Sequence, residues 1–289
     1  MTKTGPSLST TGPAYGSENG RLSPTEPEEL AVTLHSRAYG TAGPPVVILH
    51  GLLGSHRNWR SIAQSLAADH RVHAADLRNH GESPHSDLMD YPHLTADVAS
   101  LIHGLELGRV RLIGHSLGGK VAMCLALAEP DLVESVAIVD MAPVAYPNRN
   151  APILEALRTL PLAELSDRRS ADQQLAARIP DTSLRQFLLT NLVQTHDGFS
   201  WQPNIAVLAS AGPVLSDFPA FSPETAFPGP ALFISGALSP YRIMDHRDAI
   251  GTLFPEARHR EIAGAGHWPH VETPAEFLSV LRDFLTARS

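Results

Sequence analysis

A serine flanked by glycines at a fixed spacing is the clearest chemical signal in the chain. Gly114-His115-Ser116-Leu117-Gly118 follows a short apolar stretch at 110–113 and precedes a helix-like run at 120–129. A G-x-S-x-G pentapeptide between a strand and a helix is typical of a nucleophile elbow, a turn that presents a serine hydroxyl at the edge of a sheet. The two glycines leave room for the adjoining strand and helix. The pattern therefore predicts that Ser116 is a nucleophile.

A serine hydroxyl reacts at neutral pH only beside a base that takes its proton and an acid that orients the base. His267 is the expected base, because it follows the last expected strand (257–262) and precedes the terminal helix (274–287). The chain order nucleophile, acid, histidine is the one found with such elbows. His270 is a nearby alternative, although it lies past Pro269 and closer to the terminal helix.

The acid is expected at Asp140, where the strand after the elbow ends. In most enzymes with this elbow the acid follows a later sheet strand, and at that position this chain has Ser239. Asp245 and Asp248 stay open as alternatives. Both stand near the start of an expected helix, where a carboxylate also suits the helix dipole.

Acyl transfer by a serine also needs backbone N–H donors about 3 Å from the developing oxyanion. Leu117, directly after the nucleophile, is expected to supply one donor, and Leu52 the other. A further set of residues is expected to brace the loops around the site rather than to react. These residues are His50, Gly51, Arg78, Asn79, His80 and His115.

The elements that must position these residues alternate between strands and helices. Expected strands cover 30–36, 45–50, 71–76, 110–113, 132–140, 230–235 and 257–262. Such alternation indicates an α/β fold with a mostly parallel sheet and helices on both faces. Ligands of these sheets bind beyond the carboxyl ends of the strands. His50, Asp76, Ser116, Asp140 and His267 all lie at or just past such ends, so we expect them to converge.

The chain is expected to divide into a leader and one domain. Residues 1–27 are rich in Ser, Thr, Gly and Pro and are expected to be a disordered leader, and residues 28–289 are expected to form the α/β domain. The strand pattern stops between Met141 and about Pro228, where short helices are expected at 153–165, 171–179, 183–193 and 205–208. A helical insertion of this kind, at about 144–228, is typical of a lid over a site.

Composition excludes several classes of partner. The net charge of −8 argues against nucleic acid and anionic membranes, which bind basic patches. No apolar run reaches the roughly 18 residues of a membrane span, and no secretory signal opens the chain, so a cytoplasmic location without membrane insertion is expected. The oligomeric state stays open between a monomer and a homodimer. The single cysteine, Cys124, excludes an intramolecular disulfide and is expected to be a buried apolar residue.

Five segments together resemble the α/β-hydrolase superfamily, and within it the small bacterial carboxylesterases and their mitochondrial abhydrolase relatives. They are His-Gly-Leu-Leu-Gly-Ser at 50–55, Asp-Leu-Arg-Asn-His-Gly-Glu-Ser-Pro-His-Ser at 76–86, Gly-His-Ser-Leu-Gly-Gly-Lys at 114–120, Val-Asp-Met-Ala-Pro at 139–143 and Gly-His-Trp at 266–268. The resemblance extends from about residue 29 to the end of the chain.

This resemblance implies an α/β-hydrolase fold with its acid after the strand that follows the elbow, which favours Asp140. It also implies a small-molecule substrate, a short-chain acyl ester or thioester, hydrolysed without a metal or an organic cofactor. Carbon–carbon bond, lactone or perhydrolase chemistry on the same triad is an alternative. A hydrolase-fold binding protein without turnover is another.

Overall fold

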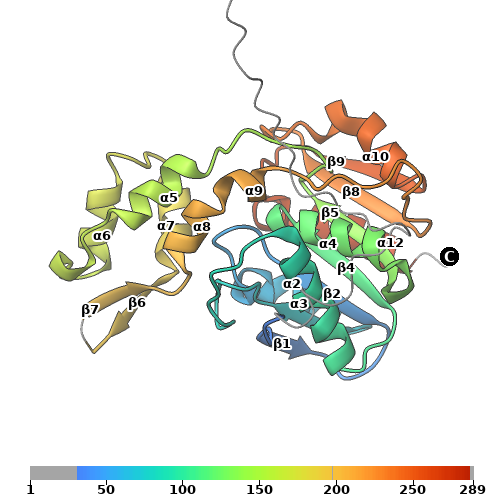
Figure 1. The fold of residues 1–289 in the computed structure, drawn as a ribbon, viewed down its shortest axis with the longest axis horizontal. Coiled ribbons are helices and arrows are strands. Elements are labelled where there is room, and N and C mark those ends of the chain that lie inside the picture. Colours follow the sequence, from blue (N-terminus) through green and yellow to red (C-terminus); the bar gives the residue numbers. More distant parts are fainter. Residues whose placement is uncertain (1–30, 197, 287–289) are drawn as a thin grey trace, which may run out of the picture.

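A seven-stranded sheet forms the centre of the molecule, with the strand order β1-β3-β2-β4-β5-β8-β9 (Figure 1). The computed structural model describes residues 31–196 and 198–286, and the expected leader at 1–27 lies outside them. The strands are β1 (Ser36–Tyr39), β2 (Pro45–Leu49), β3 (Arg71–Ala75), β4 (Val110–His115), β5 (Val133–Val139), β8 (Ala231–Gly236) and β9 (Ala257–Ile262). All neighbours pair in parallel except β1, which runs antiparallel to β3.

Helices cover both faces of the sheet because successive side chains of a strand point to opposite sides. In β2, Val46 and Ile48 pack with α2 (Arg60–Leu66) and α12 (Pro274–Thr286). Val47 and Leu49 pack on the other face. The helices of that face are α3 (Tyr91–Gly104), α4 (Leu117–Ala128) and α10 (Arg247–Leu253). Burial on both sides explains the continuously apolar strands.

Short elements complete the sheet domain. They are the 3₁₀ turns η1 (His56–Trp59), η2 (Pro130–Leu132) and η4 (Ile243–His246), and the helix α11 (Pro269–Glu272).

The first strand lies later in the chain than the sequence predicts. The expected strand at 30–36 is wrong, because β1 pairs with β3 only from Ser36, which lies opposite Ala75. Two N–H groups of the backbone before it bond to side chains, while His35 O accepts from Asp76 N–H at 2.9 Å. Val32 N–H donates to Asp97 Oδ1 at 2.7 Å, and His35 N–H donates to Ser83 Oγ at 2.8 Å. An alternating sequence pattern does not show whether the backbone N–H groups will bond to a neighbouring strand or to side chains.

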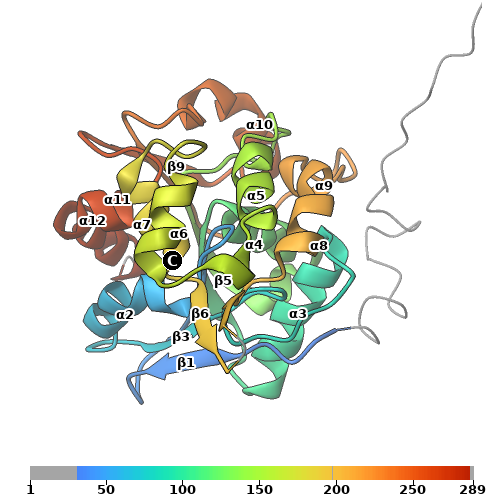
Figure 2. The same cartoon turned by 90° about the vertical axis from the view of Figure 1, so that its left-hand side faces the viewer.

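Between β5 and β8 the chain leaves the sheet, and we call residues 141–230 the insertion. Figure 1 shows it projecting to one side of the sheet, and in Figure 2 it lies in front of the sheet. Its helices are α5 (Ala151–Arg158), α6 (Arg168–Leu175), α7 (Thr182–Leu189), α8 (Ile205–Ser210) and α9 (Gly212–Ser216), with the 3₁₀ turn η3 (Leu162–Glu164).

The expectation that this region contains no strands is wrong. β6 (Leu192–Thr195) and β7 (Gly198–Trp201) form an antiparallel hairpin. The expected helix at 183–193 ends early, since α7 stops at Leu189. The side-chain amide of Asn191 then donates to Leu53 O at 2.7 Å, and the backbone carbonyl of Asn191 accepts from Gln202 N–H. Strands of four residues are too short to show a clear alternation.

Candidate active site

Ser116 stands at the turn between β4 and α4, with φ 52° and ψ −116°. A positive φ is strained for any residue with a side chain, and such strain is common at functional sites. The flanking glycines make the turn possible. A Cβ at Gly114 would lie 2.3 Å from Gly118 O, and one at Gly118 would lie 2.5 Å from His50 O. The elbow therefore excludes side chains on both sides of Ser116.

Asp140, directly after β5, contacts the imidazole of His267. Its Oδ2 accepts from His267 Nδ1 at 2.7 Å and from the hydroxyl of Ser239, and its Oδ1 accepts from Gly236 N–H at 3.2 Å. Asp140 is fully buried. Because an ionised carboxylate only accepts, Nδ1 of His267 carries a proton and Nε2 is left to accept one.

Two aromatic rings hold the imidazole of His267 in place. The ring of Tyr241 stacks on it with the centroids 4.2 Å apart and an angle of 24°, and the centroid of the His115 ring lies 4.7 Å from that of His267. His115 also donates from Nε2 to the carbonyl of His267 at 2.8 Å. Burial, and next the charge of His267, lowers the pKa of His115 well below its usual value. His115 is therefore a neutral ring that positions the loop.

The two amides expected to bind an oxyanion border the same space. Leu117 is the first residue of α4, so its N–H precedes the helical hydrogen-bond pattern. Within the described residues, neither Leu117 N–H nor Leu52 N–H has an acceptor. His50 fixes the turn before Leu52, because its Nδ1 donates to Gly51 O at 2.8 Å while its Nε2 accepts from Leu77 N–H at 3.0 Å. Burial lowers the pKa of His50, consistent with this neutral tautomer.

The loop after β3 is held by buried polar contacts. Arg78 makes a bidentate ion pair with Asp97, at 2.6 and 2.7 Å, and both side chains are fully buried. The side-chain oxygen of Asn79 accepts from Ser86 N–H, and its backbone carbonyl accepts from Asn204 N–H in the insertion. His80 donates from Nδ1 to Arg78 O at 2.9 Å, and burial lowers its pKa to about 3. These contacts join the loop to α3 and to the insertion.

The alternative residues lie in other environments. Asp245 is exposed and pairs with Arg242 at 2.6 Å, and Asp248 lies in the first turn of α10. His270 stacks flat on Trp59, at 4.3 Å and 3°, and burial together with His267 lowers its pKa to about 3. In the structure His267, through Nδ1, is therefore the histidine that contacts Asp140. His270 is buried against Trp59 instead.

One group of side chains could in principle ligate a metal. His35, His56 and Asp76 bring ring nitrogens and a carboxylate oxygen within 4.8 Å of one another. Asp76 Oδ2 already accepts from His35 Nδ1 at 3.0 Å, from His56 Nδ1 at 2.9 Å and from Glu82 N–H at 2.9 Å. Hydrogen bonds account for this cluster, which ties the loop after β3 to the segments before β1 and α2.

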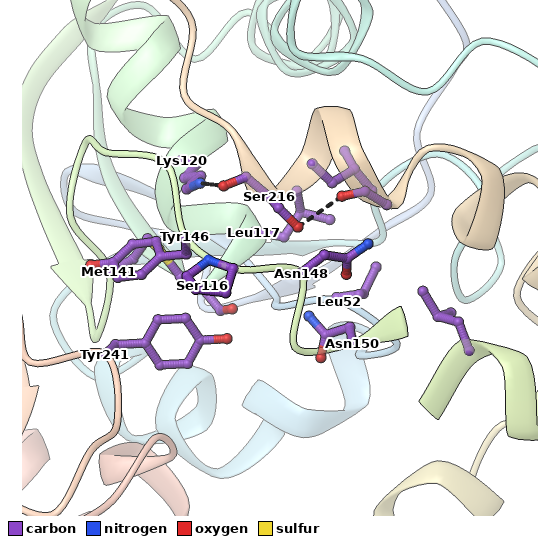
Figure 3. Close-up of a pocket in the computed structure, with 14 residues that line it drawn as sticks. Leu52, Ser116, Leu117, Lys120, Met141, Tyr146, Asn148, Asn150, Ser216 and Tyr241 are labelled. Carbon is purple, nitrogen blue, oxygen red and sulfur yellow. Dashed lines mark hydrogen bonds between the residues drawn. The ribbon is translucent and has the colours of Figure 1, made fainter. Parts of the chain in front are cut away.

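Ser116 lies where two pockets meet. The inner pocket, of about 40 Å³, is drawn in Figure 3; the outer pocket measures about 710 Å³. Both are lined by Leu52, Ser116, Asn150 and Tyr241. The inner pocket adds Leu117, Lys120, Met141, Tyr146, Leu215 and Ser216, and the outer pocket adds His267, Trp268, Leu184 and Phe187.

Sequence reasoning missed the inner pocket, because most of its wall comes from the two ends of the insertion. One signal was available in Lys120. Lysine occurs only there and at position 3, so a lysine one helical turn after Ser116 is unusual for this chain.

The geometry defines a class of protein, and comparison with known families agrees. A model of the α/β-hydrolase fold matches residues 44–274, and the chain belongs to this family. It is 43% identical over 251 residues to the sn-1-specific diacylglycerol lipase ABHD11 of Xenopus tropicalis, with 84% of this chain and 78% of the relative covered. It is 35% identical over 242 residues to the esterase YbfF of Escherichia coli, with 83% and 92% covered.

A solved structure gives the same result. A marine microorganism esterase superposes with a TM-score of 0.85 at 35% identity, over 88% of this chain and all of the esterase. The predicted fold class and the predicted resemblance are therefore confirmed. Among the described helices, none combines the length and hydrophobicity that a membrane span requires.

Proposed function

We propose that the protein is a serine carboxylesterase that hydrolyses short-chain acyl esters through an acyl-enzyme. At the level of reaction class the sequence prediction is confirmed: the chain is an ester hydrolase, like the lipase and esterases it resembles. The nucleophile, the triad and the acyl length are our proposals, supported by the geometry around Ser116.

The hydrogen bond between Asp140 and His267 supports the following acylation step. Ser116 Oγ attacks the ester carbon while His267 Nε2 takes the hydroxyl proton, since Nδ1 is engaged by Asp140. The carbonyl oxygen becomes an oxyanion that the N–H groups of Leu52 and Leu117 bind. His267 then gives its proton to the departing alcohol. The ester bond breaks and leaves the acyl group on Ser116.

Deacylation repeats these steps with water. His267 takes a proton from water, whose oxygen attacks the acyl carbon, and the same two amides bind the second oxyanion. Return of the proton to Ser116 releases the carboxylic acid and restores the enzyme. Asp140 stabilises the imidazolium in both halves of the cycle and stays ionised.

The unequal pockets carry the proposal about chain length. The inner pocket of about 40 Å³ is lined by Ser116 and by Leu52 and Leu117, the residues whose amides we propose bind the oxyanion. A cavity needs roughly 10–15 Å³ to hold one water molecule, so the inner pocket has room for about three groups of that size. We therefore expect it to take only a few carbon atoms of an acyl chain. The outer pocket, which is mostly apolar and about 710 Å³, would take the alcohol portion.

A series of p-nitrophenyl esters tests this assignment. We expect kcat/KM to be highest for acetate to butyrate and to fall at least tenfold by octanoate, and Ser116→Ala to lose turnover of all of them. A rise of kcat/KM towards octanoate and longer chains would place the acyl chain in the outer pocket and contradict the proposal. Wild-type turnover by Ser116→Ala would contradict the nucleophile itself.

Other parts of the sequence interpretation stay predictions. They are the cytoplasmic location, the monomeric or homodimeric state and the division into a leader and one domain with a lid. For the substrate, the relatives support an ester or a lipid, and the short acyl group is the finer proposal made above.

A further inference from the structure

Lys120 is a buried cation that the proposed reaction does not use. It lies on α4. Its backbone N–H donates to the backbone carbonyl of Ser116 at 3.1 Å, so Lys120 stands one helical turn beyond the proposed nucleophile. Its side chain is only 2% exposed. The ammonium is bonded to backbone carbonyls. Nζ donates to Ser216 O at 2.8 Å and to Asp217 O at 2.6 Å (Figure 3 shows the contact with Ser216).

We call the entry segment around Tyr146 and the last helix, α9 with Asp217, the two ends of the insertion. The two carbonyls belong to the second of these ends, and the first end meets them. Ser216 closes α9, whose last carbonyls have no helical partner. The carbonyl of Ser216 also accepts from Tyr146 N–H at 2.9 Å, where the chain enters the insertion. The ammonium lies 5.4 Å from the centroid of the Tyr146 ring, within range of a cation–π contact. One side chain of α4 therefore contacts both ends of the insertion.

The same residues form the wall of the inner pocket. Lys120, Tyr146 and Ser216 line it together with Ser116. A shift of either end of the insertion relative to α4 would change the space beside the nucleophile. We propose that Lys120 is a positioning residue whose ammonium clamps both ends of the insertion to the nucleophile helix and so sets the limit on acyl size.

The cost of burying this charge supports a positioning role. Burial disfavours an ammonium whose partners are neutral carbonyls, and it lowers the pKa of Lys120 to about 8. An apolar side chain of similar length would avoid that cost. It would also leave Asp217 O without this donor and release the exit of the insertion. Tyr146 N–H would still bind Ser216 O, so loss of the ammonium should loosen the wall rather than unfold it.

The test compares Lys120→Met with a matched control, Arg185→Met. Arg185 is also a buried cation, 7% exposed. It donates to Ile179 O and Pro180 O at 2.8 and 2.9 Å and forms an ion pair with Asp172 at 2.8 Å. These contacts lie inside the insertion, and Arg185 does not line the inner pocket. The control therefore reports general loosening of the insertion.

The readout is the ratio of kcat/KM for p-nitrophenyl acetate to that for the octanoate, with kcat and KM measured separately. We expect Lys120→Met to lower this ratio at least tenfold, by raising KM for acetate and lowering KM for octanoate. Arg185→Met should leave the ratio within about twofold of wild type, near the scatter of a few tenths of a kcal/mol for such comparisons. An unchanged ratio in Lys120→Met, or an equal change in both variants, would overturn the proposal.

The inference depends on the proposed esterase function, so a second measurement separates the two. Limited proteolysis reads the clamp without any substrate. We expect Lys120→Met to be cut within residues 144–217 faster than wild type and at sites near 217, while Arg185→Met is cut elsewhere in the insertion. If the wild-type protein did not hydrolyse the esters, the proposed esterase function alone would be refuted. If Lys120→Met gave the same proteolysis pattern as the wild type, the proposed clamping role of Lys120 alone would be refuted.

Discussion

Replacing Asp140 by Asn tests the orientation of the proposed catalytic base, His267, because the side chains of Asp and Asn have the same shape. In the structure Oδ1 of Asp140 accepts from Gly236 N–H at 3.2 Å, while Oδ2 accepts from His267 Nδ1 at 2.7 Å and from the Ser239 hydroxyl. An amide has one acceptor and one donor end. It can therefore satisfy only one side of this arrangement.

The better orientation of the amide gives the wrong tautomer. If the NH₂ group faced Gly236, two N–H donors would meet in the interior, which costs about 1–3 kcal/mol. With the oxygen towards Gly236, the NH₂ group faces Ser239, whose hydroxyl can turn to accept, and His267 Nδ1. Nδ1 must then be unprotonated and Nε2 protonated, so Nε2 cannot accept the proton of Ser116.

We expect Asp140→Asn to lower kcat for p-nitrophenyl acetate by about 10⁴, as the same change does in serine proteases. That factor corresponds to about 5 kcal/mol in the activation barrier. KM and the melting temperature should change little. The control is Asp245→Asn, whose carboxylate is exposed and pairs with Arg242, and it should keep wild-type kcat. Wild-type turnover by Asp140→Asn together with an inactive Asp245→Asn would refute the reasoning.

Three further perturbations follow from the contacts around the site. Gly118→Ala places a Cβ 2.5 Å from two backbone oxygens and should lower the unfolding free energy by at least about 3 kcal/mol in urea, whereas Gly251→Ala, with nothing within 4 Å, should not destabilise. Leu52→Ala keeps its N–H, so kcat for the acetate ester should stay within about threefold. A hundredfold loss would contradict a backbone role. His270 binds its proton only near pH 3 when folded but near pH 6.5 when unfolded, so stability should fall as pH drops between these values. His270→Gln should reduce that slope by about 1.4 kcal/mol per pH unit near pH 5, and an unchanged slope would contradict the buried neutral ring.

The parts of the fold that sequence predicts well are those with a strong local pattern. β2 and β8 are continuously apolar and lie where expected, and the elbow motif places Ser116 between β4 and α4. The chain order of strand ends was enough to suggest that Asp140 and His267 would meet, because parallel strands share one carboxyl edge. The sequence shows Ser239 only as the residue in place of the usual acid, and its hydrogen bond to Asp140 depends on how the two loops meet in the fold.

The parts that sequence does not predict depend on tertiary contacts. The β6–β7 hairpin is stabilised by Asn191, whose partners Leu53 and Gln202 lie in different elements. β1 begins late because Asp97 and Ser83 supply acceptors to the segment before it. The hydrogen bonds of Lys120 to Ser216 O and Asp217 O join residues 96 and 97 positions apart, and no local pattern encodes them.

The central claim is that His267 activates Ser116, and covalent labelling tests it most directly. An alkyl fluorophosphonate reacts with an activated serine, and peptide mass spectrometry locates the adduct. We predict one adduct per chain, on Ser116, and its loss in His267→Gln protein that keeps the wild-type melting temperature. Rapid labelling of Ser116 in that variant, or an adduct on another residue of a protein that still hydrolyses p-nitrophenyl acetate, would contradict the account.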